Sequence, residues 1–152
     1  MKKKINSFKL TLPAISINEA YCRNLAVSFL MHADPTVEEI ADIKTVMSEA
    51  VTNCIVHAYK NETNENKKTI YITGTHFDDN TFKFIIKDKG CGIADIQKAM
   101  TPLFTTDFEN ERSGMGIPIM QSFSDSLKIH SEAGRGTTVV FTKKINNANN
   151  CE

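Results

Sequence analysis

Glu49 and Asn53 are the first residues of this chain whose types and spacing could do chemistry. They lie four positions apart in a segment with apolar residues at helical spacing, so both side chains fall on one face of the expected helix. A lone pair of this kind is most often the solvent-facing edge of a helix. As a site, Asn53 would offer its amide oxygen to Mg²⁺, and Glu49 would act as general base on an incoming hydroxyl group.

Asp88, Gly90 and Gly92 form a second motif, which follows the apolar segment 82–86. A carboxylate at the end of a strand can accept a hydrogen bond from an exocyclic amino group such as that of adenine. The two glycines permit positive φ angles and close approach of a ligand. Taken without the other motifs, the pattern fits an ordinary strand-ending turn about equally well.

Ser113, Gly114, Met115 and Gly116 form the third motif, at the start of an expected helix. Ser113 can cap that helix, and the glycines leave backbone N–H groups at its positive end, where phosphate binds. Arg112 could reach a γ-phosphate or the carboxylate of a partner. A glycine-rich capping turn is the plain alternative, and the pattern is neither a Walker loop nor a Rossmann fingerprint. The three motifs together predict a nucleotide site.

The elements that must position these motifs follow from periodicity and turn residues. Thr36 and Glu39 form a capping box for the helix that carries Glu49. We expect strands at 5–12, 69–77, 81–87, 126–131 and 137–144, and helices at 19–32, 37–59, 94–100 and 117–123. This order predicts an α+β fold, a two-layer sandwich in which helices cover one face of a mixed, mostly antiparallel sheet.

The composition predicts one ordinary domain. Of the 152 residues 41% are hydrophobic and 24% charged, which suffices for a single core. We expect this domain to span 1–145, with a lid at about 90–113 and a disordered tail at 146–152. The 18 basic residues balance the 18 acidic ones, which argues against a general nucleic-acid binder.

Cysteine usage and hydropathy indicate the compartment. Cys22, Cys54, Cys91 and Cys151 have neither zinc spacing nor a paired framework, which suits a reducing cytoplasm. The basic N-terminus is not followed by the apolar segment of a signal peptide, and no apolar run approaches the ~20 residues that cross a bilayer. We therefore expect a cytoplasmic protein with no membrane partner.

The three motifs resemble those of the Bergerat, or GHKL, ATP-binding fold shared by gyrase, histidine kinases and MutL. More narrowly, residues 48–59, 102–106 and 111–116 resemble the anti-sigma F factor family, serine kinases of spore-forming bacteria. The likeness runs from about residue 8 to about residue 144. It implies a homodimer that binds and inhibits sporulation sigma factor F in an ATP-dependent way. It also implies phosphorylation of a serine on an anti-anti-sigma factor.

The resemblance further implies roles for individual residues, with ATP and Mg²⁺ as cofactors. Glu49 would be the catalytic base, Asn53 the Mg²⁺ ligand and Asp88 the reader of adenine. Arg23, on the first helix, matches an arginine that the family uses on its sigma factor. The other residues implied to shape the ATP site are Gly90, Gly92, Thr105, Thr106, Gly114, Met115, Gly116 and Thr138.

Two residues and three alternative functions stay open. His57 could touch nucleotide, although a helix-end histidine satisfied by the backbone fits nearly as well. Cys91 stands where the family usually has a less reactive residue. A histidine-kinase domain would need a phospho-acceptor histidine on a separate helical hairpin, which the sequence does not suggest. A non-catalytic module would bind ATP without transferring phosphate, and a gyrase- or MutL-like ATPase would need a transducer domain.

Overall fold

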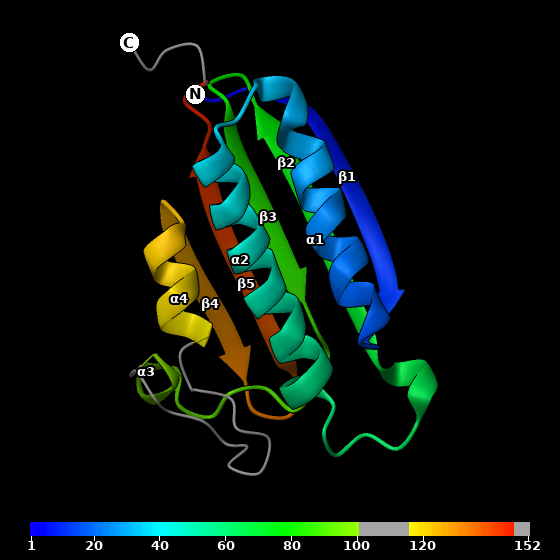
Figure 1. Cartoon of the computed structure of the whole chain (residues 1–152). Helices are drawn as coiled ribbons and strands as arrows, with labels where there is room; N and C mark the ends of the chain where they lie inside the picture. Colours follow the sequence, from blue (N-terminus) through cyan, green and yellow to red (C-terminus); the bar gives the residue numbers. More distant parts are fainter. Residues whose placement is uncertain (101–115, 148–152) are drawn as a thin grey trace.

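Five strands form the sheet of this computed structural model, which describes residues 1–100 and 116–147 (Figure 1). They are β1 (Lys4–Pro13), β2 (Thr69–Phe77), β3 (Thr81–Lys87), β4 (Ser126–Glu132) and β5 (Gly136–Lys144). Their order across the sheet is β1-β2-β3-β5-β4. Short hairpin turns join β2 to β3 and β4 to β5. Strands joined by so short a turn run antiparallel.

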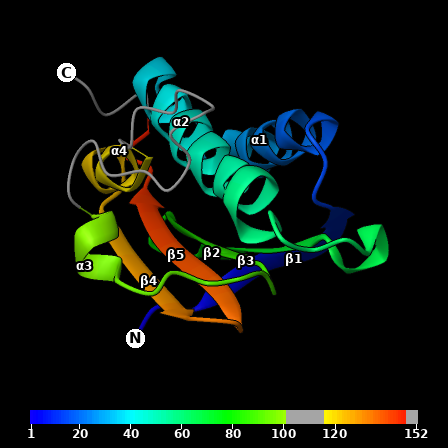
Figure 2. The ribbon, with the colours of Figure 1, turned by 90° about the horizontal axis from the view of Figure 1, so that it is seen from below.

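Three helices pack on one face of this sheet: α1 (Ile17–Leu30), α2 (Val37–Asn53) and α4 (Gly116–Phe123) (Figure 2). The short α3 (Ile96–Ala99) lies near the edge that carries β4 (Figure 2). This arrangement confirms the predicted α+β two-layer sandwich. The expectation of a mixed sheet needs correction, because all strand pairings within the described residues are antiparallel.

Aromatic rings fill the space between the sheet and the helices. Phe84 and Phe141 stack with their ring centroids 5.2 Å apart, and Phe29 of α1 meets Phe82 edge-on at 5.7 Å. Such rings bury large apolar areas and favour these offset geometries. α2 contributes a buried row to the same core: Ile43, Val46, Met47, Ala50 and Val51. The core therefore fixes the position of α2, the helix that carries Glu49 and Asn53.

The two ends of α2 differ in structure. Its start has the predicted capping box, in which the Glu39 N–H donates to Thr36 Oγ1 at 3.1 Å and the Thr36 N–H donates to Glu39 Oε2 at 2.9 Å. Its α-helical part ends at Asn53 and continues as a π-helix over Cys54–Ala58. The helical segment thus reaches almost to the predicted end, but with a wider last turn. π-turns of this kind occur frequently at functional sites.

Most other elements match the expectations closely. β2 and β3 have the predicted bounds, and 3₁₀ turns at Met31–Ala33 and Glu65–Lys67 were not foreseen. In the predicted tail, the Asn146 N–H donates to Glu39 Oε1 at 3.0 Å, so the tail packs on the domain at least to that residue. Residues 101–113 of the expected lid lie outside the described residues. Within residues 1–100 and 116–147, the helices are too short or too polar to span a membrane.

Candidate functional site

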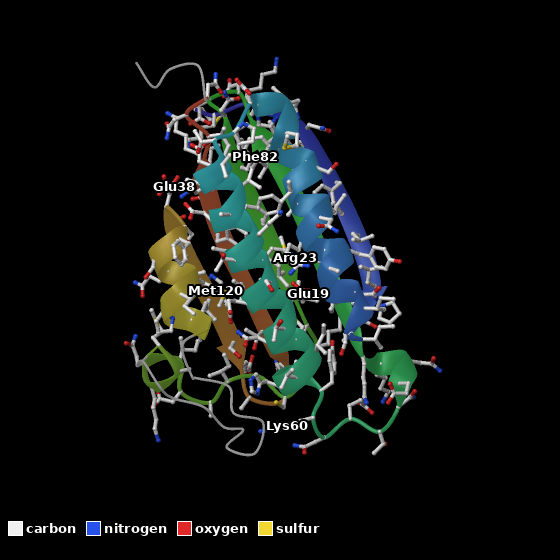
Figure 3. The ribbon with its side chains drawn as sticks, in the orientation of Figure 1. Glu19, Arg23, Glu38, Lys60, Phe82 and Met120 are labelled. Atoms are coloured by element: carbon white, nitrogen blue, oxygen red, sulfur yellow. The ribbon has the colours of Figure 1, made fainter. Side chains whose placement is uncertain are left out.

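A cavity of about 640 Å³ opens at the end of the molecule where α2 ends and α4 begins. Part of its wall is apolar, with Ile86 of β3, Val139 of β5 and Met120 of α4 among the lining residues (Met120 is labelled in Figure 3). The predicted site residues supply part of its remaining lining: Glu49, Asn53, His57, Asp88, Gly92 and Gly116. Segments far apart in the sequence are therefore brought to one concave site, as expected of a small-molecule pocket.

Asp88 lines this cavity, directly after β3, and is only 5% exposed. Its Oδ1 accepts hydrogen bonds from the backbone N–H groups of Gly90 at 2.9 Å and Thr137 at 3.2 Å. Its Oδ2 accepts one from the thiol of Cys54 at 3.7 Å. Burial raises the pKa of Asp88, and these three hydrogen bonds partly offset that effect by stabilising the carboxylate.

Glycines bring the chain close enough to enclose Asp88. A Cβ at residue 90 would overlap the carbonyl oxygen of Ala58, at the end of the π-helix. A Cβ at residue 136 would overlap the backbone of Asp88, and Gly136 also has a φ of +101°, which favours glycine. The glycine at position 90 therefore allows contact between two parts of the chain, and its role in close ligand approach stays a prediction.

The side chains of Glu49 and Asn53, which belong to α2, lie next to the start of α4. A Cβ built on Gly116 would stand 3.1 Å from Glu49 Oε2 and 3.7 Å from Asn53 Oδ1, so the first residue of α4 faces both side chains. The first N–H groups of a helix have no partner within it and carry partial positive charge. An anionic group bound at this point would meet those N–H groups, a carboxamide and a carboxylate together.

Metal-binding capacity at this end is limited in the part of the chain that the structure describes. No group of three or more His, Cys, Asp or Glu side chains there could hold a metal ion. Asn53 offers one amide oxygen, a hard ligand suited to Mg²⁺. These residues therefore fit a magnesium ion that takes most of its ligands from phosphate groups and water.

Comparison with known proteins gives the family. The family described as histidine kinase-like ATPase domain matches residues 15–143. A Caldanaerobacter subterraneus protein named anti-sigma F factor is 48% identical over 92% of this chain and 94% of its own length. A Bacillus subtilis protein of the same name is 45% identical over 92% and 93%. The chain belongs to the anti-sigma F factor family.

Solved structures show the same fold at much lower identity. The RsbU and RsbW domains of a Mycobacterium tuberculosis protein match with a TM-score of 0.66 and 18% identity, over 93% of this chain and 33% of that one. The SiaB–SiaC complex of Pseudomonas aeruginosa contains a match with a TM-score of 0.59 and 9% identity, over 89% and 88%. This anti-sigma F family member is therefore an anti-sigma factor of the GHKL type with an ATP-binding domain.

Thr137, and not Thr138, lines the cavity of this family member. Side chains alternate between the two faces of a strand, so Thr137 shares a face with the buried Val139 and Phe141, while Thr138 points the other way. Residues 137–141 read Thr-Thr-Val-Val-Phe, without alternation of polar and apolar residues, so the sequence carries no signal that favours Thr137 over Thr138. Cys54 was missed as well, and no local pattern distinguishes it from a core residue.

Arg23 lies outside the cavity, on α1. Its guanidinium pairs with Glu19 at 3.3 Å, and Figure 3 shows both side chains beside α2. Arg23 lines a groove of about 510 Å³ between α1 and α2, to which Lys44 and Glu49 also contribute. Glu49 therefore borders both this groove and the cavity.

The remaining predicted residues divide into two groups. His57, on the π-helix, lines the cavity, as does Cys91, whose thiol donates to the carbonyl oxygen of His57 at 3.4 Å. The other group lies outside the described residues and consists of Thr105, Thr106, Arg112, Ser113, Gly114 and Met115.

Proposed function

We propose that this protein is an ATP-dependent inhibitor of sigma factor F in the cytoplasm that also transfers the γ-phosphoryl group of ATP to a serine of an anti-anti-sigma factor. The names of the relatives motivate the choice of partners. The lining of the cavity carries the proposal, because the buried Asp88 and the pair Glu49 and Asn53, which meet the start of α4, line the same cavity. As in the family, the active form would be a homodimer.

The lining of the cavity supports a placement of ATP with its base at Asp88 and its phosphates at the start of α4. Asp88 would accept a hydrogen bond from the exocyclic amino group of adenine, with Thr137 beside it. The phosphates would extend towards the start of α4, where backbone N–H groups and Asn53 lie. Asn53 would hold Mg²⁺, which supplies charge neutralisation to the phosphates when bound. His57, Gly92 and Gly116 would complete the walls of the site.

Glu49 would act on the substrate hydroxyl group. Its carboxylate would take the proton of the serine as the serine oxygen forms a bond to the γ-phosphorus. The bond from the γ-phosphorus to the β–γ bridging oxygen would break, and ADP would leave with that electron pair. Catalysis of this kind depends chiefly on positioning and electrostatics. The position of Glu49, between the cavity and the α1–α2 groove, lets a protein substrate approach it from the groove.

Replacement of Glu49 by glutamine tests this proposal. The substitution keeps size and hydrogen bonding but removes the base, so transfer to the acceptor protein should fall about 10²- to 10⁴-fold. ATP affinity, measured by calorimetry, should stay within about threefold of wild type, because Glu49 is not assigned to hold the nucleotide. The product should be acid-stable, as phosphoserine is and phosphohistidine is not.

Glu38→Gln is the matched control, because Glu38 is an exposed residue near the start of the same helix, far from the cavity (Figure 3). That variant should transfer phosphate at the wild-type rate. Equal rates in the Glu49 and Glu38 variants would reject Glu49 as the base. An acid-labile product would instead favour a histidine-kinase type of activity, and ATP binding without any transfer would favour a binding module.

Partner binding is tested at Arg23. We expect Arg23→Ala to weaken capture of sigma factor F in the presence of ATP while leaving ATP affinity unchanged. Arg135→Ala is the matched control, because Arg135 also pairs with a glutamate three or four positions away but lies highly exposed beside β5. Equal capture by both variants would remove Arg23 from the interface. Capture that is the same with ADP as with ATP would contradict the nucleotide dependence.

A further inference from the structure

Cys54 is a polar contact of Asp88 that the proposed function does not use. It begins the π-helix, is 3% exposed and lines the cavity. Its Sγ lies 3.7 Å from Asp88 Oδ2. A thiol can donate a hydrogen bond, whereas an ionised carboxylate can only accept one. Cys54 is therefore the donor in this hydrogen bond, and the carboxylate is the acceptor.

The two oxygens of Asp88 differ in how many further hydrogen bonds they can accept. A carboxylate oxygen has two lone-pair positions, and those of Oδ1 are taken by the N–H groups of Gly90 and Thr137. Oδ2 has one position occupied by the Cys54 thiol and one left. Since Asp88 lines the cavity, a ligand that bonds to its carboxylate does so through Oδ2. The ligand and Cys54 therefore share one oxygen atom.

The state of this oxygen decides which purine it can bind. An ionised Asp88 only accepts, which matches the amino group at position 6 of adenine. A protonated Asp88 donates from one oxygen, which matches the carbonyl group at position 6 of hypoxanthine or guanine. An ionised carboxylate facing that carbonyl would leave two acceptors opposed, and buried sites reject such mismatches strongly.

We propose that Cys54 is a positioning residue that keeps Asp88 as a hydrogen-bond acceptor and thereby makes the site select a 6-aminopurine over a 6-oxopurine. The proposal rests on the function proposed above, in which Asp88 reads the base. The thiol donates to the carboxylate and so favours its ionised form, against the opposing effect of burial. It also orients the oxygen that meets the ligand.

Two substitutions separate this role from packing. Cys54→Ala and Cys54→Ser have similar volumes and differ by one hydroxyl group, so loss of thiol volume affects both alike. The probes are ATP and inosine triphosphate, and the readout is the ratio of their dissociation constants from calorimetry. We expect the ratio in favour of ATP to fall about threefold to tenfold in Cys54→Ala, the loss typical of one ordinary hydrogen bond, because a thiol is a weak donor. Cys54→Ser should recover most of that ratio.

The pH dependence gives a second readout. Without the donor, Asp88 takes up a proton more easily, so the preference for ATP in Cys54→Ala should disappear at a higher pH than in Cys54→Ser. Thermal unfolding confirms that each variant is folded. If Cys54→Ala does not fold, Cys54→Val replaces it, because valine fills the space of the thiol and has no donor.

Several outcomes would overturn the proposal, and they differ from failure of the proposed function. Equal weakening of both nucleotides in Cys54→Ala, with an unchanged ratio, would make Cys54 a packing residue. Identical ratios and pH profiles in the Ala and Ser variants would also reject it. By contrast, a wild-type protein that does not discriminate between the two nucleotides, or whose discrimination survives Asp88→Asn, would reject Asp88 as the reader of the base.

Discussion

Two buried carboxylates lie at opposite ends of the helix and sheet layers and serve different purposes. Glu39, near the start of α2, is 7% exposed, and Asp88, just after β3, is 5% exposed. Each oxygen of Glu39 accepts from a backbone N–H group, those of Thr36 and Asn146. Asp88 receives both of its backbone N–H groups on one oxygen and faces the cavity. A buried carboxylate is thus a candidate binding group when it lines a cavity and one of its oxygens can still accept a hydrogen bond.

The surroundings of Glu39 include a second set of polar contacts, formed by His32, His76 and Asn80. His32 Nε2 and His76 Nδ1 are 2.9 Å apart, and His76 Nε2 lies 3.2 Å from Asn80 Oδ1. The ring of His76 also stacks on Phe82, which Figure 3 shows near the end of the molecule opposite Lys60. Here polar groups are satisfied by one another, which is how buried polar networks hold a fold together.

The largest expected effect compares the isosteric substitutions Asp88→Asn and Glu39→Gln. Asparagine presents an N–H donor or a weaker acceptor where adenine needs a carboxylate, so ATP affinity should fall about 10- to 100-fold. Glu39→Gln should leave ATP affinity within about twofold of wild type, because no part of Glu39 reaches the cavity. Calorimetric titration of both variants measures this. Similar losses in the two would mean that buried acids act on ATP only through stability.

The second effect is on stability, and here the change at Glu39 is the one with a large effect. Glu39→Ala removes one half of the capping box and the acceptor of the Asn146 N–H group, which should lower the free energy of unfolding by about 2 kcal/mol. Denaturant titration measures the loss, and ATP affinity should not change. The exposed neighbour Glu38→Ala should cost less than about 0.5 kcal/mol. An equal loss in both would show that the buried contacts of Glu39 contribute nothing.

The elements could be predicted where the signal is local. The Thr36–Glu39 capping box and the turn at 78–80 fix the start of α2 and the β2–β3 hairpin, and both were found. The π-helix at Cys54–Ala58 could not be predicted, because its apolar residues follow ordinary helical spacing. A tertiary contact accompanies it: the Cys91 N–H donates to the carbonyl oxygen of Ala58 at 2.7 Å. Sequence periodicity carries no information about such a partner.

The site shows the same limit. Glu49, Asn53 and Asp88 could be proposed from residue type and spacing, since each belongs to a short motif. Cys54 and Thr137 could not, because they meet Asp88 across 34 and 49 positions of sequence. Their contribution depends on how β5 and the end of α2 pack beside β3. Local chemistry therefore identifies the reacting groups, and the fold determines what surrounds them.

A third and smaller effect separates two neighbours on β5. Thr137→Val removes a hydroxyl group at the cavity, one that shares a hydrogen bond of 2.8 Å with Ser131. ATP affinity should fall about threefold to fivefold, as for one neutral hydrogen bond. Thr138→Val is the matched control on the opposite face, where valine suits a strand, and it should bind ATP as wild type does. The reverse order of effects would restore Thr138 as the residue near the base.

The smallest effect concerns the ionisation of Asp88. Burial raises its pKa above the ordinary value of 3.8, and the three hydrogen bonds it accepts partly oppose the rise. Without nucleotide, the native state therefore holds this proton more tightly than the unfolded chain does, so stability should decline as pH rises from the unfolded pKa through the native one. ATP affinity should depend on pH in the opposite direction, because adenine binds to the ionised carboxylate. The affinity should therefore fall as pH drops through the native pKa.

Asp88→Asn isolates both slopes. Subtracting its pH profile from that of wild type removes other groups, such as Asp79, whose pKa is lowered to about 2, first by a hydrogen bond from Lys2. Denaturant titrations without ATP and calorimetry with ATP, from acid to neutral pH, give the two difference curves. We expect the free energy of unfolding to decline and the ATP affinity to rise as pH increases, because the ionised carboxylate is disfavoured by burial and is the form that binds adenine. Flat curves would place Asp88 with Glu39, as an acid that is buried only to hold the fold.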